Sequence, residues 1–227
     1  MADLLQLSLL PVLLTLGAFQ LGVLIQKKLK SPLANPVLLA VFLVLGFMAL
    51  TGFRLEQYQA GMQNVSWLLT PATVCLAIPM YEHFQTLRKN LPAMLAGIAA
   101  GAVACLFMVL GLSLLFRFDA ALTVTVLPKS VTSAIGAPLS ELYGGLTSVT
   151  TACIIFTGIL ANILGSLLCK IFRLTDPVAR GVAFGTSGHV IGTAKAAEMS
   201  PVTGAASSLA MVVAGLLTSV IFPLFVP

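Results

Sequence analysis

Residues 127–133 read Leu-Pro-Lys-Ser-Val-Thr-Ser, and residues 185–193 read Gly-Thr-Ser-Gly-His-Val-Ile-Gly-Thr. Both stretches combine Pro or Gly, which stop helices, with several hydroxyl side chains. They stand in a chain of 227 residues that is 59% hydrophobic and 8% charged, with a net charge of +5. Soluble domains carry about 25% charged residues, so this composition indicates a membrane protein. The two stretches are therefore expected to interrupt helices at membrane depth.

Six apolar runs around these stretches are long enough to cross a bilayer, which takes about 20 helical residues. The runs are Leu4–Gln26, Pro32–Gly52, Ser66–Thr86, Pro92–Phe116, Thr147–Phe172 and Thr203–Val226. The third contains Pro71 and Pro79 and is expected to be kinked twice. Arg54–Asn64 is expected to be a polar loop. We predict one membrane domain, with N-terminal helices over residues 1–119 and a core over residues 120–227.

The basic residues predict how the two semi-polar segments, Ala120–Tyr143 and Gly181–Met199, lie in the membrane. If the first segment crossed fully, Lys170, Arg173 and Arg180 would lie outside, against the positive-inside rule. If both segments are hairpins that enter from opposite sides, basic residues 27, 28, 30, 88, 89, 170, 173 and 180 lie inside. Arms of about ten residues, at about 1.5 Å each, reach the midplane. Both termini are then predicted outside the cytoplasm, for a protein of the bacterial inner membrane.

The sequence contains an internal repeat, and each of the two segments begins one copy of it. Ile135-Gly136 precedes Glu141 as Ile191-Gly192 precedes Glu198, and beyond them Gly158 matches Gly215 at an offset of 57 residues. Inverted repeats with broken helices are typical of secondary transporters. The predicted fold is an all-α polytopic membrane protein with about six transmembrane helices plus two oppositely oriented re-entrant hairpins in an inverted repeat.

Irregular backbone at membrane depth is tolerated where it is buried in protein or lines a cavity. Helix N-termini, hydroxyl groups and ammonium groups together would bind an anion there. The predicted substrate-binding residues are Lys129, Ser130, Thr132, Ser133, Thr186, Ser187, His189, Gly192, Thr193 and Lys195.

Alternatives stay open for the charged groups. Lys129 could pair with Glu141, and Lys195 with Glu198, instead of contacting a substrate. The two glutamates could carry a coupling proton or lie at the interface, and His189 could be a hydrogen-bonded structural residue. A lining role, weighed against a structural kink in the third run, is considered for Thr70, Pro71, Thr73 and Asn162.

Several functions are disfavoured. The Lys and Arg residues form no dense patch with aromatic residues, so no nucleic-acid partner is expected. Residues 185–188 match the GxSG of intramembrane serine proteases, but His189 follows Ser187 too closely to act as its base. No enzyme activity, catalytic residue, metal ligand or cofactor is predicted. The cysteines, without any CxxC, are expected to be packing thiols: Cys75, Cys105, Cys153 and Cys169.

Nearly the whole chain resembles the CidB/LrgB family. The resemblance lies in Pro71–Val74, Ala77–Pro79, Leu127–Thr132, Thr157–Ile159, Asp176–Gly181, Gly185-Thr186, His189, Ile191–Ala194 and Glu198. The chain departs from the family's usual pattern at Ser133-Ala134-Ile135 and has Lys195 where Arg is usual.

The resemblance implies two functions. One is transport of small carboxylate anions, 2-hydroxy- or 2-oxo-acids such as glycolate, glycerate and pyruvate, by alternating access. The other is a holin-like membrane regulator of murein hydrolase export and autolysis, which acts with a separate LrgA/CidA-type subunit. Polarity concentrated in two short breaks, instead of a stripe along several helices, favours a carrier over a pore. Expected partners are the carboxylate, membrane lipid, that subunit and a second copy in a homodimer.

Overall fold

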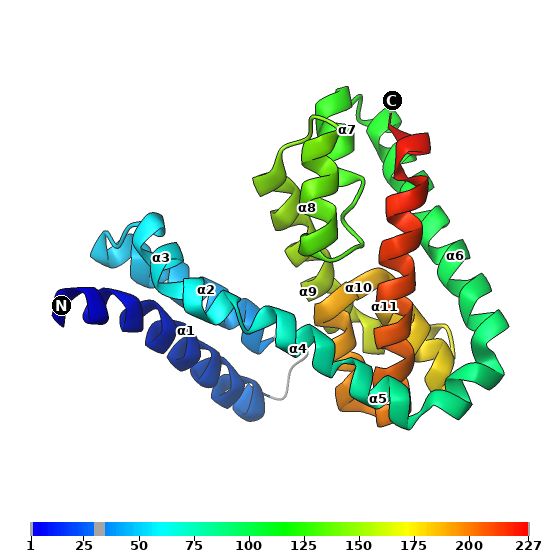
Figure 1. Ribbon diagram of the computed structural model, residues 1–227, viewed down its shortest axis with the longest axis horizontal. Coiled ribbons are helices and arrows are strands. Elements are labelled where there is room, and N and C mark those ends of the chain that lie inside the picture. Colours follow the sequence, from blue (N-terminus) through cyan, green and yellow to red (C-terminus); the bar gives the residue numbers. More distant parts are fainter. Residues whose placement is uncertain (1, 30–34, 227) are drawn as a thin grey trace. The chain divides into compact units, whose positions relative to one another are not determined.

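The computed structural model describes residues 2–29 and 35–226, and within these ranges it contains helices and no strand (Figure 1). The backbone forms two compact units, one up to Cys75 and one from Leu76 onward. Among the described residues, four helices are long and apolar enough to cross a membrane: α1 (Ala2–Leu29), α6 (Phe84–Leu115), α9 (Thr147–Ile171) and α11 (Pro201–Ile221). The predicted all-α, multi-pass membrane class is therefore confirmed.

The first unit packs α1 against α2 (Pro36–Thr51) and α3 (Leu55–Ser66), and α4 (Leu69–Cys75) follows them. The Thr15 and Tyr58 hydroxyl oxygens lie 2.7 Å apart and link α1 to α3. The prediction of a polar loop over Arg54–Asn64 is wrong, because this segment forms α3. Its Leu, Glu, Gln and Met residues are good helix formers. The segment was predicted as a loop because it contains no apolar run.

The predicted third span is not a single helix. It consists of α4 and α5 (Ala77–Glu82), and α6 begins at Phe84, before the predicted start at Pro92. Pro71 and Pro79 are each the third residue of a short helix. Proline is tolerated there because the first-turn N–H groups have no helical partner. The helices separate at Trp67 and at Leu76, each within one turn before a proline, so the run is interrupted at the two expected places.

The first hairpin consists of α7 (Ala120–Val126), a non-helical tip at residues 127–132, and α8 (Ser133–Leu142). The Asp119 carboxylate caps α7 by accepting from the Leu122 N–H at 2.7 Å. The Leu146 N–H donates to Thr125 Oγ1 at 2.8 Å, so the segment after α8 returns to α7. The hairpin lies at the end of the second unit where the chain ends (Figure 1).

The second hairpin is α10 (Pro177–Met199), which turns back at His189, where φ is 40° and ψ is −133°. A Cβ on Gly192 would lie 2.6 Å from the Phe184 carbonyl oxygen, although residues eight apart in a straight helix are about 12 Å apart. Both arms pack on α11. A Cβ on Gly181, in the first arm, would lie 2.5 Å from the Thr203 carbonyl oxygen, and a Cβ on Gly204 of α11 would lie 2.9 Å from Ala197 Cα in the second arm. The predicted helix breaks in both segments are therefore confirmed.

Glycine contacts are equivalent in the two hairpins, as expected for two copies of one repeated unit. A Cβ on Gly136 would lie 3.1 Å from the Pro128 carbonyl oxygen, which repeats the relation of Gly192 to a residue eight earlier. A Cβ on Gly158, in α9, would lie 3.0 Å from Ile191 Cβ in the second hairpin. A Cβ on Gly215, in α11, would lie 2.8 Å from Ile135 Cδ1 in the first hairpin. Each long helix thus contacts the hairpin of the other copy.

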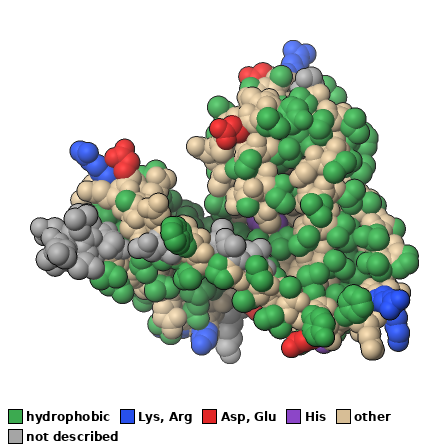
Figure 2. All heavy atoms as spheres, in the orientation of Figure 1, with side chains coloured by type: hydrophobic (Ala, Val, Ile, Leu, Met, Phe, Trp, Pro, Cys, Tyr) green, Lys and Arg blue, Asp and Glu red, His purple; other side chains and the backbone are tan. Residues whose placement is uncertain are grey.

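Apolar side chains cover much of the face of the second unit that Figure 2 shows. On the face that Figure 2 shows, the charged side chains of this unit gather mainly toward opposite ends. Phe107 and Met108, in the second half of α6, are 60% and 65% exposed. Such exposure of large apolar groups suits contact with lipid.

Candidate functional site

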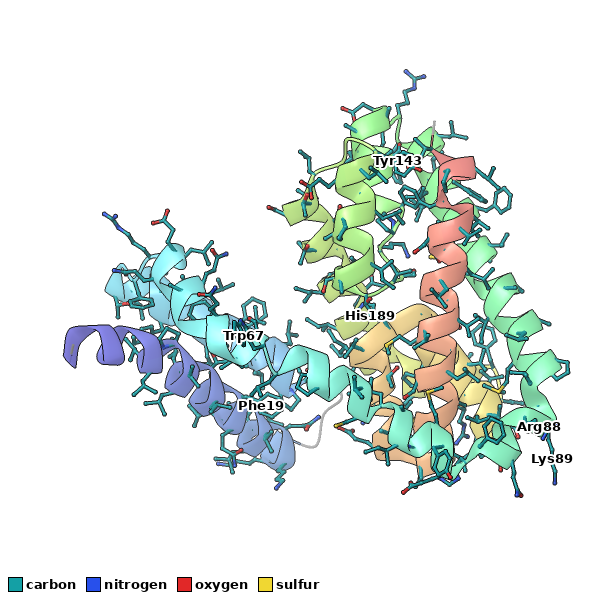
Figure 3. The ribbon with its side chains drawn as sticks, viewed as in Figure 1. Phe19, Trp67, Arg88, Lys89, Tyr143 and His189 are labelled. Carbon is teal, nitrogen blue, oxygen red and sulfur yellow. The ribbon has the colours of Figure 1, made fainter. Side chains whose placement is uncertain are left out.

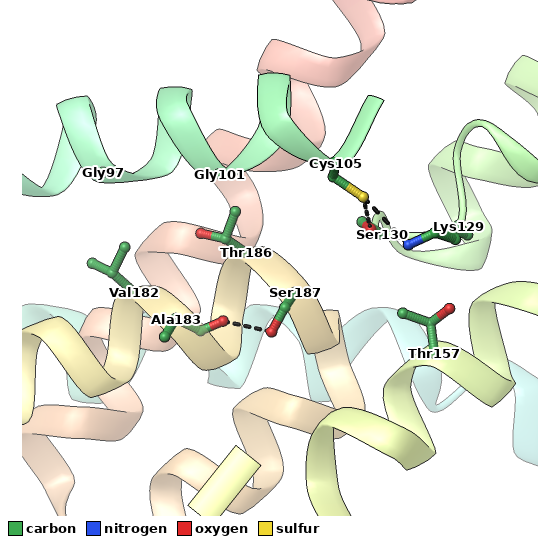
Figure 4. A pocket seen from close by; sticks show the side chains of 10 residues that line it. All are labelled: Gly97, Gly101, Cys105, Lys129, Ser130, Thr157, Val182, Ala183, Thr186 and Ser187. Atoms are coloured by element: carbon green, nitrogen blue, oxygen red, sulfur yellow. Dashed lines mark hydrogen bonds between the residues drawn. The ribbon is translucent and has the colours of Figure 1, made fainter. Parts of the chain in front are cut away.

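A cavity of about 250 Å³ lies where the two hairpin tips approach each other (Figure 4). Its walls come from the first tip, the first arm of α10, and the middle of α6 and α9. The lining residues are Gly97, Gly101, Cys105, Lys129, Ser130, Thr157, Val182, Ala183, Thr186 and Ser187.

The first tip presents Lys129 and Ser130 because the residues on either side of them are buried. Leu127 and Val131 are 1% and 3% exposed and anchor the tip in the core. Lys129 Nζ donates to Cys105 Sγ at 3.4 Å, and Ser130 Oγ lies 2.7 Å from the same sulfur. The tip is thereby joined to α6.

The second hairpin contributes Thr186 and Ser187 from its first arm. Ser187 Oγ donates to the Ala183 carbonyl oxygen at 2.6 Å. Thr186 is 8% exposed, and its hydroxyl has no hydrogen-bond partner among the described residues. An unsatisfied buried hydroxyl costs about 1–3 kcal/mol, which a ligand or a water that binds there would recover.

Lys129 gives the cavity a positive charge. Among the residues described as its lining, Lys129 is the only charged one, and Ser130, Thr157, Thr186 and Ser187 supply hydroxyl groups. An ionisable group at membrane depth is costly and is usually tied to function. One cation with several neutral donors is the chemistry that binds a small anion.

His189, Gly192 and Thr193 have structural contacts away from the cavity lining. The His189 ring is 3% exposed, and its Nε2 lies 2.8 Å from the Ile154 carbonyl oxygen of α9 (Figure 3). Thr193 Oγ1 lies 2.9 Å from Ser207 Oγ of α11. These contacts fix the second hairpin between α9 and α11.

Lys195 and Glu198 form the pair that the sequence left as an alternative. Lys195 Nζ donates to Glu198 Oε2 at 2.8 Å, and the two side chains are 27% and 67% exposed. They lie in the second arm of α10, outside the cavity lining. Glu141 is exposed in the last turn of α8, while Lys129 donates to Cys105.

The remaining predicted residues lie outside the cavity lining. Thr132 and Ser133 begin α8, where the Thr132 carbonyl accepts from the Gly136 N–H at 2.8 Å. Asn162 Nδ2 donates to the Ile191 carbonyl oxygen at 3.3 Å and supports the second hairpin. Pro71 is exposed in the first unit, and the side chains of Thr70 and Thr73 lie outside the described residues.

Sequence reasoning missed the contributions of α6 and α9. Gly97, Gly101 and Cys105 follow one another at intervals of four, so they share one face of α6. A Cβ on Gly101 would lie 3.0 Å from Thr186 Cγ2. Small residues at this spacing allow close helix approach in membranes, and that signal could have identified the face.

Comparisons with known proteins agree with the resemblance seen in the sequence. A model of the LrgB-like family matches residues 15–227. The antiholin-like protein LrgB of Bacillus subtilis (strain 168) is 35% identical over 216 residues, which cover 95% of this chain and 94% of the relative. The antiholin-like protein LrgB of Bacillus cereus (strain B4264) is 34% identical over 217 residues, with the same coverage. No solved structure matches the chain.

Proposed function

The chain belongs to the LrgB-like family. From the arrangement of its two hairpins we propose that it carries small carboxylate anions across the membrane by alternating access. The observation that supports this proposal is the cavity between the two hairpins, with Lys129 as the charged residue of its lining. Its volume of about 250 Å³ lies below that of drug-sized pockets, about 300–1,000 Å³, and suits a small substrate.

The chemistry of the cavity favours a monoanion that carries a second oxygen function. The Lys129 ammonium would bind the carboxylate, and the hydroxyls of Ser130, Thr157 and Thr186 would bind the remaining oxygens. Glycolate, glycerate and pyruvate have this composition. The inverted relation of the hairpins supports alternating access, because such repeats can exchange conformations around a central site.

The names of the relatives favour a second function, more directly than they favour transport. The relatives described above are called antiholin-like, and their names mention neither a carboxylate nor transport. We therefore also propose that the chain acts as a holin-like regulator of murein hydrolase export and autolysis in the bacterial inner membrane. In that function it would act with a separate LrgA/CidA-type subunit.

Uptake of labelled glycolate, glycerate and pyruvate into proteoliposomes tests the first proposal. We expect Lys129→Gln to lower uptake about tenfold or more, because a hydrogen bond to a charged group contributes about 1.5–3 kcal/mol. Lys195→Gln is the matched variant, because Lys195 pairs with Glu198 outside the cavity lining, and it should retain wild-type uptake.

Equal uptake by wild type and Lys129→Gln would contradict the proposed role of the cavity. No uptake of any of the three acids by folded protein would overturn the carrier function. If overproduction of that same protein changed murein hydrolase release from cells, the second function would be supported instead.

A further inference from the structure

The Cys105 thiol contacts both polar side chains of the first tip. Its sulfur accepts from Lys129 Nζ at 3.4 Å and lies 2.7 Å from Ser130 Oγ (Figure 4). We infer that Cys105 is a positioning residue of the anion site, which holds Lys129 and Ser130 in place while the site is empty and releases them to the anion. This inference rests on the proposed carrier function.

Cys105 and the tip lie on two well-anchored elements. On α6, the neighbouring residues Ala102 and Leu106 are 5% and 2% exposed, so the helix is fixed beside the cavity. The tip is anchored by buried residues on either side of Lys129 and Ser130, as described above. Since both backbones are held, the thiol sets where the flexible Lys129 side chain ends.

A thiol suits this position because it is a weak hydrogen-bond donor and a weak acceptor. It orders the ammonium without neutralising it, so a carboxylate can displace it. An aspartate at position 105 would instead form a salt bridge with Lys129 and compete with the substrate. A serine would retain a neutral contact of similar geometry.

Thr186, on the facing wall, independently indicates a ligand. Its hydroxyl is buried and has no partner in the part of the chain that the structure describes, and Thr186 lines the same cavity as Cys105, Lys129 and Ser130. A carboxylate bound between the walls would take over the donors that now contact the thiol, and a rotation of the Thr186 side chain would turn its hydroxyl toward that carboxylate. Of the cysteines, Cys105 is the one that lines this cavity, while Cys153 and Cys169 belong to α9 outside its lining.

Uptake kinetics of substituted proteins test this role. We expect Cys105→Ser to keep KM for glycolate within about twofold, whereas Cys105→Ala lowers KM about fivefold at an unchanged maximal rate, because the anion no longer has to displace the thiol from Lys129 and Ser130. Cys105→Asp should abolish uptake. Cys153→Ala, a thiol outside the cavity lining, is the matched control. Wild-type KM in Cys105→Ala, or an equal shift of KM in Cys105→Ser and Cys105→Ala, would overturn the inference.

Protection of the thiol provides a readout that does not depend on transport. The wild-type protein in detergent is treated with N-ethylmaleimide, whose double bond forms a carbon–sulfur bond with Cys105 while the thiol proton ends on the adjacent carbon. Modification of Cys105 is followed by peptide mass spectrometry, with Cys153 as the internal reference. Sodium glycolate should slow it about fivefold or more relative to sodium chloride of equal ionic strength, and Lys129→Gln should remove the protection.

The outcomes separate this inference from the proposed function. Wild-type uptake without protection of Cys105 would overturn the inference and leave the carrier function standing. Protection without uptake would support an anion site at Cys105 and overturn the carrier function. Neither uptake nor protection would overturn both.

Discussion

Gly158 shows at the scale of one residue how closely the hairpins and long helices approach. A Cβ at this position would lie 2.6 Å from His189 Cε1 and 2.9 Å from His189 Nε2. We expect Gly158→Ala to displace the buried ring from the Ile154 carbonyl and to destabilise the protein by about 1–3 kcal/mol. The unfolding midpoint in detergent should therefore fall. Gly111→Ala is the control, since a Cβ on Gly111 has nothing within 4 Å. Equal midpoints of the two variants would contradict the packing described.

Local chemistry identified part of the candidate site. The tips were predicted from Pro, Gly and hydroxyl residues, and the cavity lining includes four of the ten predicted binding residues: Lys129, Ser130, Thr186 and Ser187. Their role in binding stays a prediction. His189 and Thr193 belong to the same motif, but they contact α9 and α11. A sequence motif does not show which side of a turned-back helix faces a cavity, because that depends on the packing of distant helices.

At the scale of the element, the break in α10 depends on a backbone conformation that favours glycine. His189 has φ of 40°, which is unfavourable for a residue with a side chain. Both His189→Gly and His189→Ala remove the bond to Ile154, but only glycine relieves the backbone. We therefore expect the glycine variant to be more stable than the alanine variant, by about 1 kcal/mol or more, in detergent unfolding.

A comparison of alanine with glycine at position 194 is the control for this prediction. Ala194 is exposed in the helical second arm of α10, where alanine should be more stable than glycine by about 1 kcal/mol. The order of stability should thus reverse between the two positions. A preference for alanine at both positions would show that α10 does not turn back at His189.

Elements were predictable where composition changes sharply along the chain. The apolar runs and the breaker-rich tips predicted the long helices and the hairpins. The helix α3 was missed because its residues are polar. The position of the turn at His189 was not predicted either, since a positive φ at a non-glycine residue has no clear signal in the sequence. The division of the third run into α4 and α5 had a local signal, because Pro71 and Pro79 are each the third residue of a short helix.

At the scale of the whole molecule, the packing of the second unit indicates which segments between helices lie on the same side of the membrane. Arg88 and Lys89 lie at the end opposite Tyr143 (Figure 3), and Gly181 meets Thr203 where both arms of α10 reach α11. A continuous α10 of 23 residues would span about 35 Å, enough to cross about 30 Å of hydrocarbon, so length alone does not decide its topology. The turn at His189 brings its two ends to the same side.

Accessibility of single cysteines checks this topology, in a chain that carries Cys75→Ser to remove an exposed native thiol. We expect Thr175→Cys and Ala197→Cys, on either side of the hairpin, both to react with a membrane-impermeant maleimide from the cytoplasmic side. This expectation follows because Lys170, Arg173 and Arg180 favour that side. Ser148→Cys, at the start of α9, should react from the opposite side, and Phe107→Cys, exposed on α6, should react from neither. Labelling of positions 175 and 197 from opposite sides would show that α10 crosses the membrane, and the two hairpin tips could then not form one site.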